Sequence, residues 1–176
     1  MGDAAPLLIL TGPPGSGKTT AARALVESSP AAGVHLHGDD FWDFIRSGRI
    51  DPWLPNAQAQ NATAMKALAH AARAYRDGGY FTVVDGIVGP WFLDVFRDLE
   101  LPLTYVVLRS DLQTALGRIA ARPDQGIVEA SDIAGLHAQF SSLGELERCV
   151  IDVSSLEPQA VVAALRAALR DQTFRL

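Results

Sequence analysis

The stretch PLLILTGPPGSGKTTAARAL, residues 6–25, decides the fold. An apolar run leads into a glycine-rich loop, and the loop leads into a segment of helical composition. Residues 12–19 read GPPGSGKT and fit the pattern G-x-x-x-x-G-K-[ST], in which backbone N–H groups, a lysine and a hydroxyl bind phosphate. Since the pattern stands between a predicted strand and a predicted helix, we interpret it as a phosphate-binding loop rather than a chance glycine-rich turn.

The residues of this loop have distinct chemical roles. The glycines let the backbone approach phosphate oxygens, and the start of the helix adds positive potential. Lys18, one of only two lysines in the chain, neutralises charge on the terminal phosphates. The Thr19 hydroxyl can ligate Mg²⁺. We expect the nucleotide to contact Gly12, Pro13, Pro14, Gly15, Ser16, Gly17, Lys18, Thr19 and Thr20.

The rest of the chain alternates short apolar runs with helical segments. This alternation predicts an α/β fold with a mainly parallel sheet, in one domain that covers residues 1–176. In such sheets ligands bind beyond the carboxyl ends of the strands, so the loops after the strands are the candidate sites. The predicted strands are 6–11, 33–37, 80–85, 103–109 and 149–154, and the predicted helices are 18–29, 41–48, 56–79, 90–100, 111–122, 133–146 and 157–172.

Composition narrows the class of protein. The chain has 176 residues, 48% of them hydrophobic, a net charge of −5 and a pI of about 5.3, which argues against a nucleic-acid partner. Its single cysteine excludes an internal disulfide, and no secretory signal or membrane-spanning run is seen, so we expect a cytoplasmic protein. No spacing of His, Cys and carboxylates is typical of a zinc site.

Three classes of phosphate-loop protein can be compared with this chain. GTP-binding proteins carry an N/T-K-x-D element, and the only other lysine, Lys66, stands in AMKAL. Motor and AAA-type ATPases need larger domains and partner-supplied arginines. A compact kinase remains.

The segments PGSGKTTAARAL (14–25), HGDDFW (37–42) and DG (85–86), with arginines further on, resemble the P-loop small-molecule kinases. This group includes gluconate and shikimate kinases, chloramphenicol phosphotransferase and 5′-hydroxyl polynucleotide kinases. The resemblance implies a three-layer P-loop NTPase fold similar to that of nucleoside monophosphate kinases. Its parallel sheet of five strands has the order 2-3-1-4-5, with flanking helices and a short lid at about 118–130. It also implies ATP, Mg²⁺ and a small-molecule hydroxyl acceptor; only the phosphate loop is highly specific.

Two adjacent carboxylates, Asp39 and Asp40, follow the second predicted strand. The matching segment of polynucleotide kinases reads RDD, and its first Asp is the base, which implies that role for Asp39. A hydroxyl that attacks a γ-phosphate must lose its proton, and a nearby Asp can accept it. Asp40 is then a helix cap, a substrate contact or the base itself; both aspartates serving only as caps is the structural alternative.

Asp85 follows the third predicted strand, in VVDG. We interpret it as a Walker B carboxylate that holds a Mg²⁺ water. Direct contact with the substrate is an alternative, and so is a plain turn aspartate before glycine.

Arg118 and Arg122 are four residues apart, hence on one helical face before the lid loop. In the family that the chain resembles, lid arginines close over the phosphates, which implies a catalytic role for Arg122. Arg118 would stack on adenine or pair with phosphate; a solvated helix face is the alternative. Related kinases place the loop after the fifth strand against adenine, here residues 150–158.

The segment at about 37–61 should wall the acceptor site. Its aromatic and polar side chains suit a ring-bearing or hydroxyl-rich ligand, and its arginines could hold an anionic group. The candidate substrate contacts are Asp40, Asp85, His37, Arg46, Trp42 and Arg49, although packing or helix-end roles would also explain several of them. The acceptor could be an antibiotic, a nucleoside or a sugar-like metabolite. A nucleotide or polynucleotide kinase and a nucleotide-binding regulatory ATPase module are the other functions that we considered.

Overall fold

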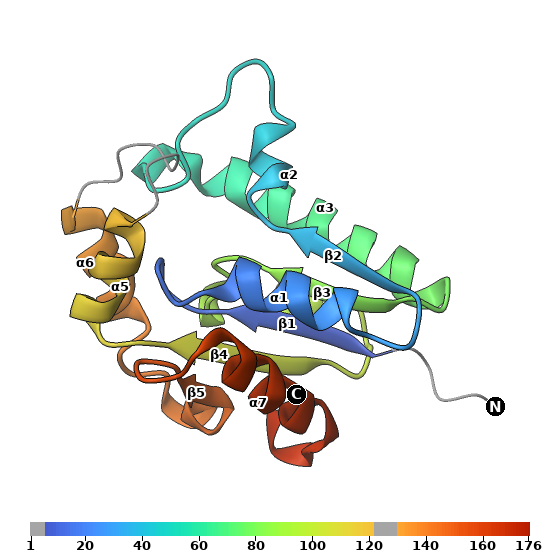
Figure 1. Cartoon of the computed structure of the whole chain (residues 1–176). Coiled ribbons are helices and arrows are strands. Elements are labelled where there is room, and N and C mark those ends of the chain that lie inside the picture. Colours follow the sequence, from blue (N-terminus) through green and yellow to red (C-terminus); the bar gives the residue numbers. More distant parts are fainter. Residues whose placement is uncertain (1–5, 122–129) are drawn as a thin grey trace.

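The chain folds around one parallel sheet in the order β2-β3-β1-β4-β5, which confirms the expected 2-3-1-4-5 order (Figure 1). The structure is a computed structural model and describes residues 6–121 and 130–176. Each strand stands close to where the apolar runs predicted it. The strands are β1 Leu7–Thr11, β2 Gly33–His37, β3 Phe81–Asp85, β4 Thr104–Arg109 and β5 Val150–Asp152.

Helices connect the strands, as parallel pairing requires. The α-helices are α1 Lys18–Glu27, α2 Asp40–Asp43, α3 Gln58–Asp77, α4 Leu93–Arg97, α5 Leu112–Ala120, α6 Ala130–Gln139 and α7 Pro158–Arg170. Short 3₁₀ turns cover Pro55–Ala57, Pro90–Phe92, Gly144–Cys149 and Gln172–Phe174.

Several helix ends differ from expectation. The helix predicted over 41–48 is the four-residue α2, Asp40–Asp43. The helix predicted over 90–100 is a 3₁₀ turn followed by the five-residue α4, which ends at Arg97; Glu100, three residues further on, has a φ of 53°. Helix α6 begins at Ala130, within a stretch expected to be loop. At α5 the expectation holds, since Asp111 caps the helix by accepting a hydrogen bond from the Thr114 N–H at 2.8 Å.

Alternate residues of the strands enter two hydrophobic layers. Leu8 and Leu10 of β1 pack with α1 and α7, whereas Leu7 and Ile9 pack with α3 and α4. All four leucine and isoleucine side chains are 1% exposed or less. Burial of each is worth about 1.5–3 kcal/mol, so the sheet is held from both faces. Figure 1 shows α1 in front of the strands.

The register of the sheet brings the candidate residues to one edge. Asp85, the last residue of β3, is aligned with Leu10 of β1 on one side and with His37 of β2 on the other. The loop after β1 therefore begins next to Asp85, and the HGDD segment begins on its other side. Within the described residues, no helix is long and apolar enough to span a membrane.

Replacement of Tyr105 by Phe should lower the free energy of unfolding by about 1–3 kcal/mol, because the buried Val88 carbonyl would lose its hydrogen bond from the Tyr105 hydroxyl at 2.8 Å. Tyr75→Phe is the matched control: Tyr75 is 43% exposed, and its loss of a hydroxyl should change stability by less than about 0.5 kcal/mol. Urea unfolding of both variants measures the difference; equal effects would contradict the role of the bond.

Candidate active site

The phosphate loop connects β1 to α1 and depends on glycine at two positions. Gly12 has a φ of 143°, and a Cβ there would collide with the Leu108 carbonyl oxygen of β4. Gly15 has a φ of 77°, and its Cβ would lie 2.6 Å from the Ala115 carbonyl oxygen of α5. The loop therefore packs against two backbone segments that leave no room for side chains.

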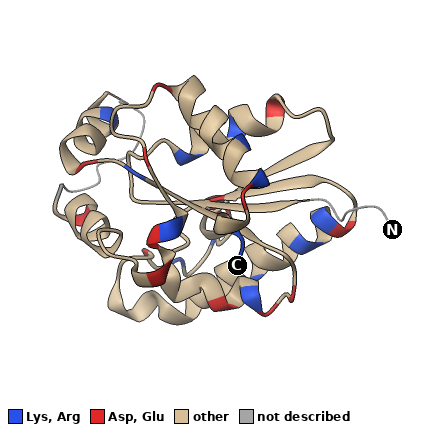
Figure 2. Cartoon of the chain, turned by 90° about the horizontal axis from the view of Figure 1, so that it is seen from below, with Lys and Arg blue, Asp and Glu red and all other residues tan. Residues whose placement is uncertain are grey.

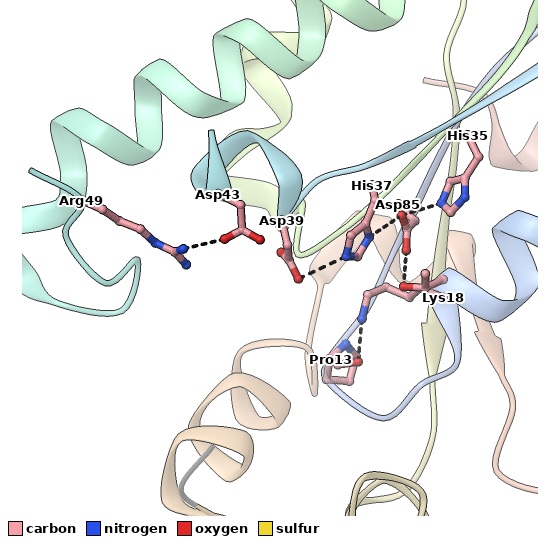
Figure 3. Close-up of polar contacts among 9 residues, drawn as sticks. Pro13, Lys18, His35, His37, Asp39, Asp43, Arg49 and Asp85 are labelled. Carbon is pink, nitrogen blue, oxygen red and sulfur yellow. Dashed lines mark hydrogen bonds and ion pairs between the residues drawn. The ribbon is translucent and has the colours of Figure 1, made fainter. Parts of the chain in front are cut away.

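Two polar side chains of the loop stand ready for an anion. Lys18 donates from Nζ to the Pro13 carbonyl at 3.0 Å, which folds its ammonium group back over the loop (Figure 3). Ser16 is 2% exposed, and its buried hydroxyl has no hydrogen-bond partner among the residues that the structure describes. An orphaned buried hydroxyl in a loop of this pattern fits a missing phosphate oxygen or water.

Asp85 is fully buried and accepts three hydrogen bonds. The Thr19 hydroxyl of α1 donates to Oδ2 at 2.5 Å. On the other oxygen, Oδ1, ring nitrogens of His35 and His37 lie at 2.7 and 2.9 Å (Figure 3). Burial alone would raise the pKa of Asp85, but the hydrogen bonds from both histidines and from Thr19 hold it well below its ordinary value. Asp85 is therefore a carboxylate, and each histidine is the donor toward it.

These groups fit Mg²⁺ in chemical type. A hydroxyl and an ionised carboxylate are the hard oxygen ligands that this cation prefers, and they stand at the end of the phosphate loop. Thr19 and Asp85, both predicted as metal residues, are thus in direct contact across 66 positions of sequence.

His37 connects Asp85 to Asp39. Its Nδ1 faces Asp85, while its Nε2 lies 3.6 Å from the Asp39 carboxylate. The hydrogen bond to Asp85 raises the pKa of His37; burial opposes this, and the charges of Asp85, Asp39 and Asp40 add to it. Of the described residues, His35, His37 and Asp85 form the one group of this kind close enough together to share a metal ion.

The Asp39 side chain does not act as a helix cap here. It precedes α2 with helical angles, φ −61° and ψ −27°, and it accepts no capping hydrogen bond. The side chain is 73% exposed, which leaves it open to a ligand. Asp40, the first residue of α2, is exposed as well.

The remaining candidates of the acceptor segment have diverse surroundings. Trp42 is 7% exposed, packs in the core and donates from its indole to Asn61 at 2.8 Å. We therefore build no part of the acceptor site on Trp42. Arg49 pairs with Asp43 of α2 at 2.5 Å (Figure 3), and Arg46 is exposed.

A cavity of about 340 Å³ lies beyond the ends of β4 and β5, and its lining residues are Arg109, Ser110, Asp111, Leu112, His137, Ser141, Asp152 and Ser154. Arg118 of α5 donates to the Val153 carbonyl at 3.0 Å, so it is tied to the segment predicted to face adenine. Arg122 lies outside the described residues, as does most of the expected lid.

His35 is the site residue that sequence analysis missed. It lies two positions before His37 on β2, so both side chains point to the same face of the strand. The pattern H-x-H next to a strand that ends in Asp was the available signal. It becomes informative only when β2 and β3 are known to be neighbours.

In the view of Figure 2, Lys and Arg residues and Asp and Glu residues are both scattered over the chain. This pattern agrees with the net charge of −5.

With fold and site in view, the chain can be compared with known proteins. It matches the family described as AAA domain over residues 8–134, more than half of its length, and it belongs to that family. Sequence analysis disfavoured the larger AAA-type ATPases; the family match covers the nucleotide-binding core from β1 onward. No curated protein matches the sequence significantly.

Three solved structures with the same fold match this chain over nearly the full length of both chains. A sugar kinase from Janibacter sp. HTCC2649 has a TM-score of 0.70 at 18% identity, with 96% of each chain covered. The tunicamycin resistance protein of Deinococcus radiodurans has a TM-score of 0.68 at 21% identity, with 93% of this chain and 94% of that chain covered. The APS kinase CysC of Mycobacterium tuberculosis, in complex with AMPPNP and APS, has a TM-score of 0.66 at 20% identity. The match covers 96% of this chain and 99% of that chain. The fold is thus that of small P-loop kinases.

Replacement of Gly12 by Ala should abolish nucleotide binding and destabilise the protein by at least about 1–3 kcal/mol, because it forces a side chain against β4 at a positive φ. Gly117→Ala, in α5, is the control: nothing lies within 4 Å of its added Cβ, and stability should rise by about 0.5–1 kcal/mol. Calorimetric titration with an ATP analogue and thermal unfolding measure both. Unchanged nucleotide affinity in the Gly12 variant would contradict the loop's assignment.

Proposed function

We propose that this protein is an ATP- and Mg²⁺-dependent phosphotransferase that moves the γ-phosphate of ATP to a hydroxyl group of a small molecule. The observation that carries the proposal is the arrangement at one sheet edge. There, the phosphate loop, the Thr19–Asp85 pair and the open carboxylate of Asp39 are linked through His37. The AAA domain family and the kinase fold support the same class of reaction.

The chain supplies the nucleotide site in two parts. Backbone N–H groups of residues 12–19 and the Lys18 ammonium bind the phosphates, and Lys18 gains the γ-phosphate as a partner in exchange for the Pro13 carbonyl. The Thr19 hydroxyl oxygen would ligate Mg²⁺, and Asp85 would support the ion through Thr19 and a Mg²⁺-bound water; when bound, Mg²⁺ neutralises charge on the phosphate oxygens. Asp85 needs no proton change for this role, since its low pKa keeps it ionised.

The acceptor hydroxyl would donate its proton to Asp39 as it attacks the γ-phosphate. A general base must be reachable by substrate, and Asp39 is exposed while Asp85 is sealed by its three donors. The neighbouring His37, whose Nε2 lies 3.6 Å from the Asp39 carboxylate, would hold this side chain at the sheet end next to Asp85. Asp40 lacks this neighbour at ion-pair distance, which is why we assign the base to Asp39 first.

The adenine would occupy the cavity beyond β4 and β5. Arg118 donates to the carbonyl of Val153, which stands in sequence between the lining residues Asp152 and Ser154, and this favours contact with the base over contact with phosphate. Arg122 would approach the transferring phosphate from the lid. The acceptor would lie over residues 37–61, where Arg46 and Arg49 supply positive charge and the exposed Phe44 and Trp53 supply apolar surface.

Replacement of Asp39 by Asn should lower kcat for phosphate transfer about 10²–10⁴-fold and leave ATP affinity unchanged, because the substitution removes the proton acceptor and leaves the phosphate loop intact. Asp43→Asn is the control. Asp43 lies on the same short helix, but its carboxylate pairs with Arg49, whereas that of Asp39 faces His37. Loss of transfer in Asp40→Asn, with activity retained in Asp39→Asn, would move the base to Asp40. A regulatory ATPase module would be little affected by any of the three.

Incubation with γ-labelled ATP and a panel of sugars, sugar acids, nucleosides and hydroxylated antibiotics should yield a labelled product from at least one class. Hydrolysis in the absence of acceptor measures the background. ATP binding without transfer to any class would contradict the phosphotransferase proposal.

A further inference from the structure

Two histidines of one strand converge on a single oxygen atom of Asp85. His35 approaches with Nε2 and His37 with Nδ1, at 2.7 and 2.9 Å from Oδ1 (Figure 3). The two residues lie on the same face of β2, and the parallel register sets His37 level with Asp85 on β3. The phosphate loop takes no part in the contact of the two histidines with Oδ1. Nucleotide binding alone therefore does not explain why both histidines are there.

We propose that His35 and His37 are positioning residues: they hold Oδ1 of Asp85 so that Oδ2 stays on the Thr19 hydroxyl, and they thereby set the affinity of the site for the nucleotide-bound Mg²⁺. The inference rests on the proposed function for the role of Asp85 toward Mg²⁺. His35 acts through Asp85 alone, whereas His37 acts through Asp85 and also lies beside Asp39.

The physical need for these donors comes from burial. Asp85 is 0% exposed, and a buried carboxylate is costly unless hydrogen bonds replace its lost water. Oδ2 has the Thr19 hydroxyl, and the two ring N–H groups satisfy Oδ1. Without them, the carboxylate could turn toward solvent or exchange its oxygens, and the Thr19 contact would lose its fixed partner. Mutation of residues that hydrogen-bond to a metal ligand commonly lowers metal affinity about 10–100-fold.

The two histidines are not equivalent. His35 is 16% exposed and has one described acidic contact, Asp85. His37 is 33% exposed and also faces Asp39 with Nε2 at 3.6 Å. His37 therefore couples the position of the base to that of Asp85, whereas His35 serves Asp85 alone.

Amide substitutions separate hydrogen bonding from other roles. A glutamine amide reaches close to the position of a histidine Nε2, and an asparagine amide close to that of Nδ1. His35→Gln and His37→Asn should therefore preserve the donors to Asp85. The crossed pair, His35→Asn and His37→Gln, has the same composition and places each amide at the wrong distance.

The measurement is the gain in affinity for a non-hydrolysable ATP analogue when Mg²⁺ replaces EDTA, by calorimetric titration of the full chain. We expect His35→Gln and His37→Asn to show the same Mg²⁺-dependent gain in affinity as the wild type. In His35→Asn and His37→Gln, this gain should be about tenfold smaller. Affinity in EDTA should be the same in all five proteins, which shows that the phosphate loop is folded. This readout needs no acceptor, so it holds even if the phosphotransferase proposal fails.

Three results would overturn the inference. The first is an equal Mg²⁺ gain in all variants, and the second is no gain in the wild type. The third is Co²⁺ binding to the nucleotide-free wild type, with visible absorption bands that His35→Gln and His37→Asn both abolish. That outcome would make the histidines and Asp85 ligands of a transition metal, which takes nitrogen and oxygen ligands at about 2.0–2.2 Å.

Discussion

The hydrogen bond between the Thr19 hydroxyl and the buried carboxylate of Asp85 is the contact on which the site depends. It ties the first turn of α1 to the end of β3, and it forms because β1 and β3 pair in parallel with Leu10 next to Asp85. The phosphate loop lies between these anchors. Its shape is therefore held from the sheet side by Asp85, and from the other side by the close approach of Gly12 and Gly15 to β4 and α5.

Two carboxylates at this edge have opposite environments. Asp85 is buried, ionised and held by three donors, whereas Asp39 is exposed and has the His37 ring nitrogen at 3.6 Å. A fixed anion suits the binding of a cation, and an open one suits exchange of a proton with a ligand that comes and goes. His37 lies between them and touches both, so the arrangement divides two tasks between neighbours that the sheet holds close together.

Much of this could be predicted from residues near one another in sequence. The GPPGSGKT pattern predicted the loop, Asp111 predicted the start of α5, and the apolar runs predicted five strands, because each signal is local. The strand order came from the resemblance to P-loop kinases rather than from periodicity. The helix over 90–100 proved shorter, since residues 90–92 form a 3₁₀ turn and α4 ends at Arg97, which composition does not reveal.

What sequence could not give were contacts made across the sheet. His35 was overlooked because its partner lies 50 positions away on a neighbouring strand. Trp42 reads as a ligand contact in sequence, yet its indole packs inward against Asn61 of α3.

A crystal structure with Mg²⁺ and a non-hydrolysable ATP analogue tests the central claim most directly. The account predicts the β- and γ-phosphates within the loop of residues 12–19, Mg²⁺ beside Thr19 and Asp85, and the Asp39 carboxylate on the open side of the γ-phosphate. Phosphates bound elsewhere, or a γ-phosphate that the Asp39 side chain cannot approach, would contradict it.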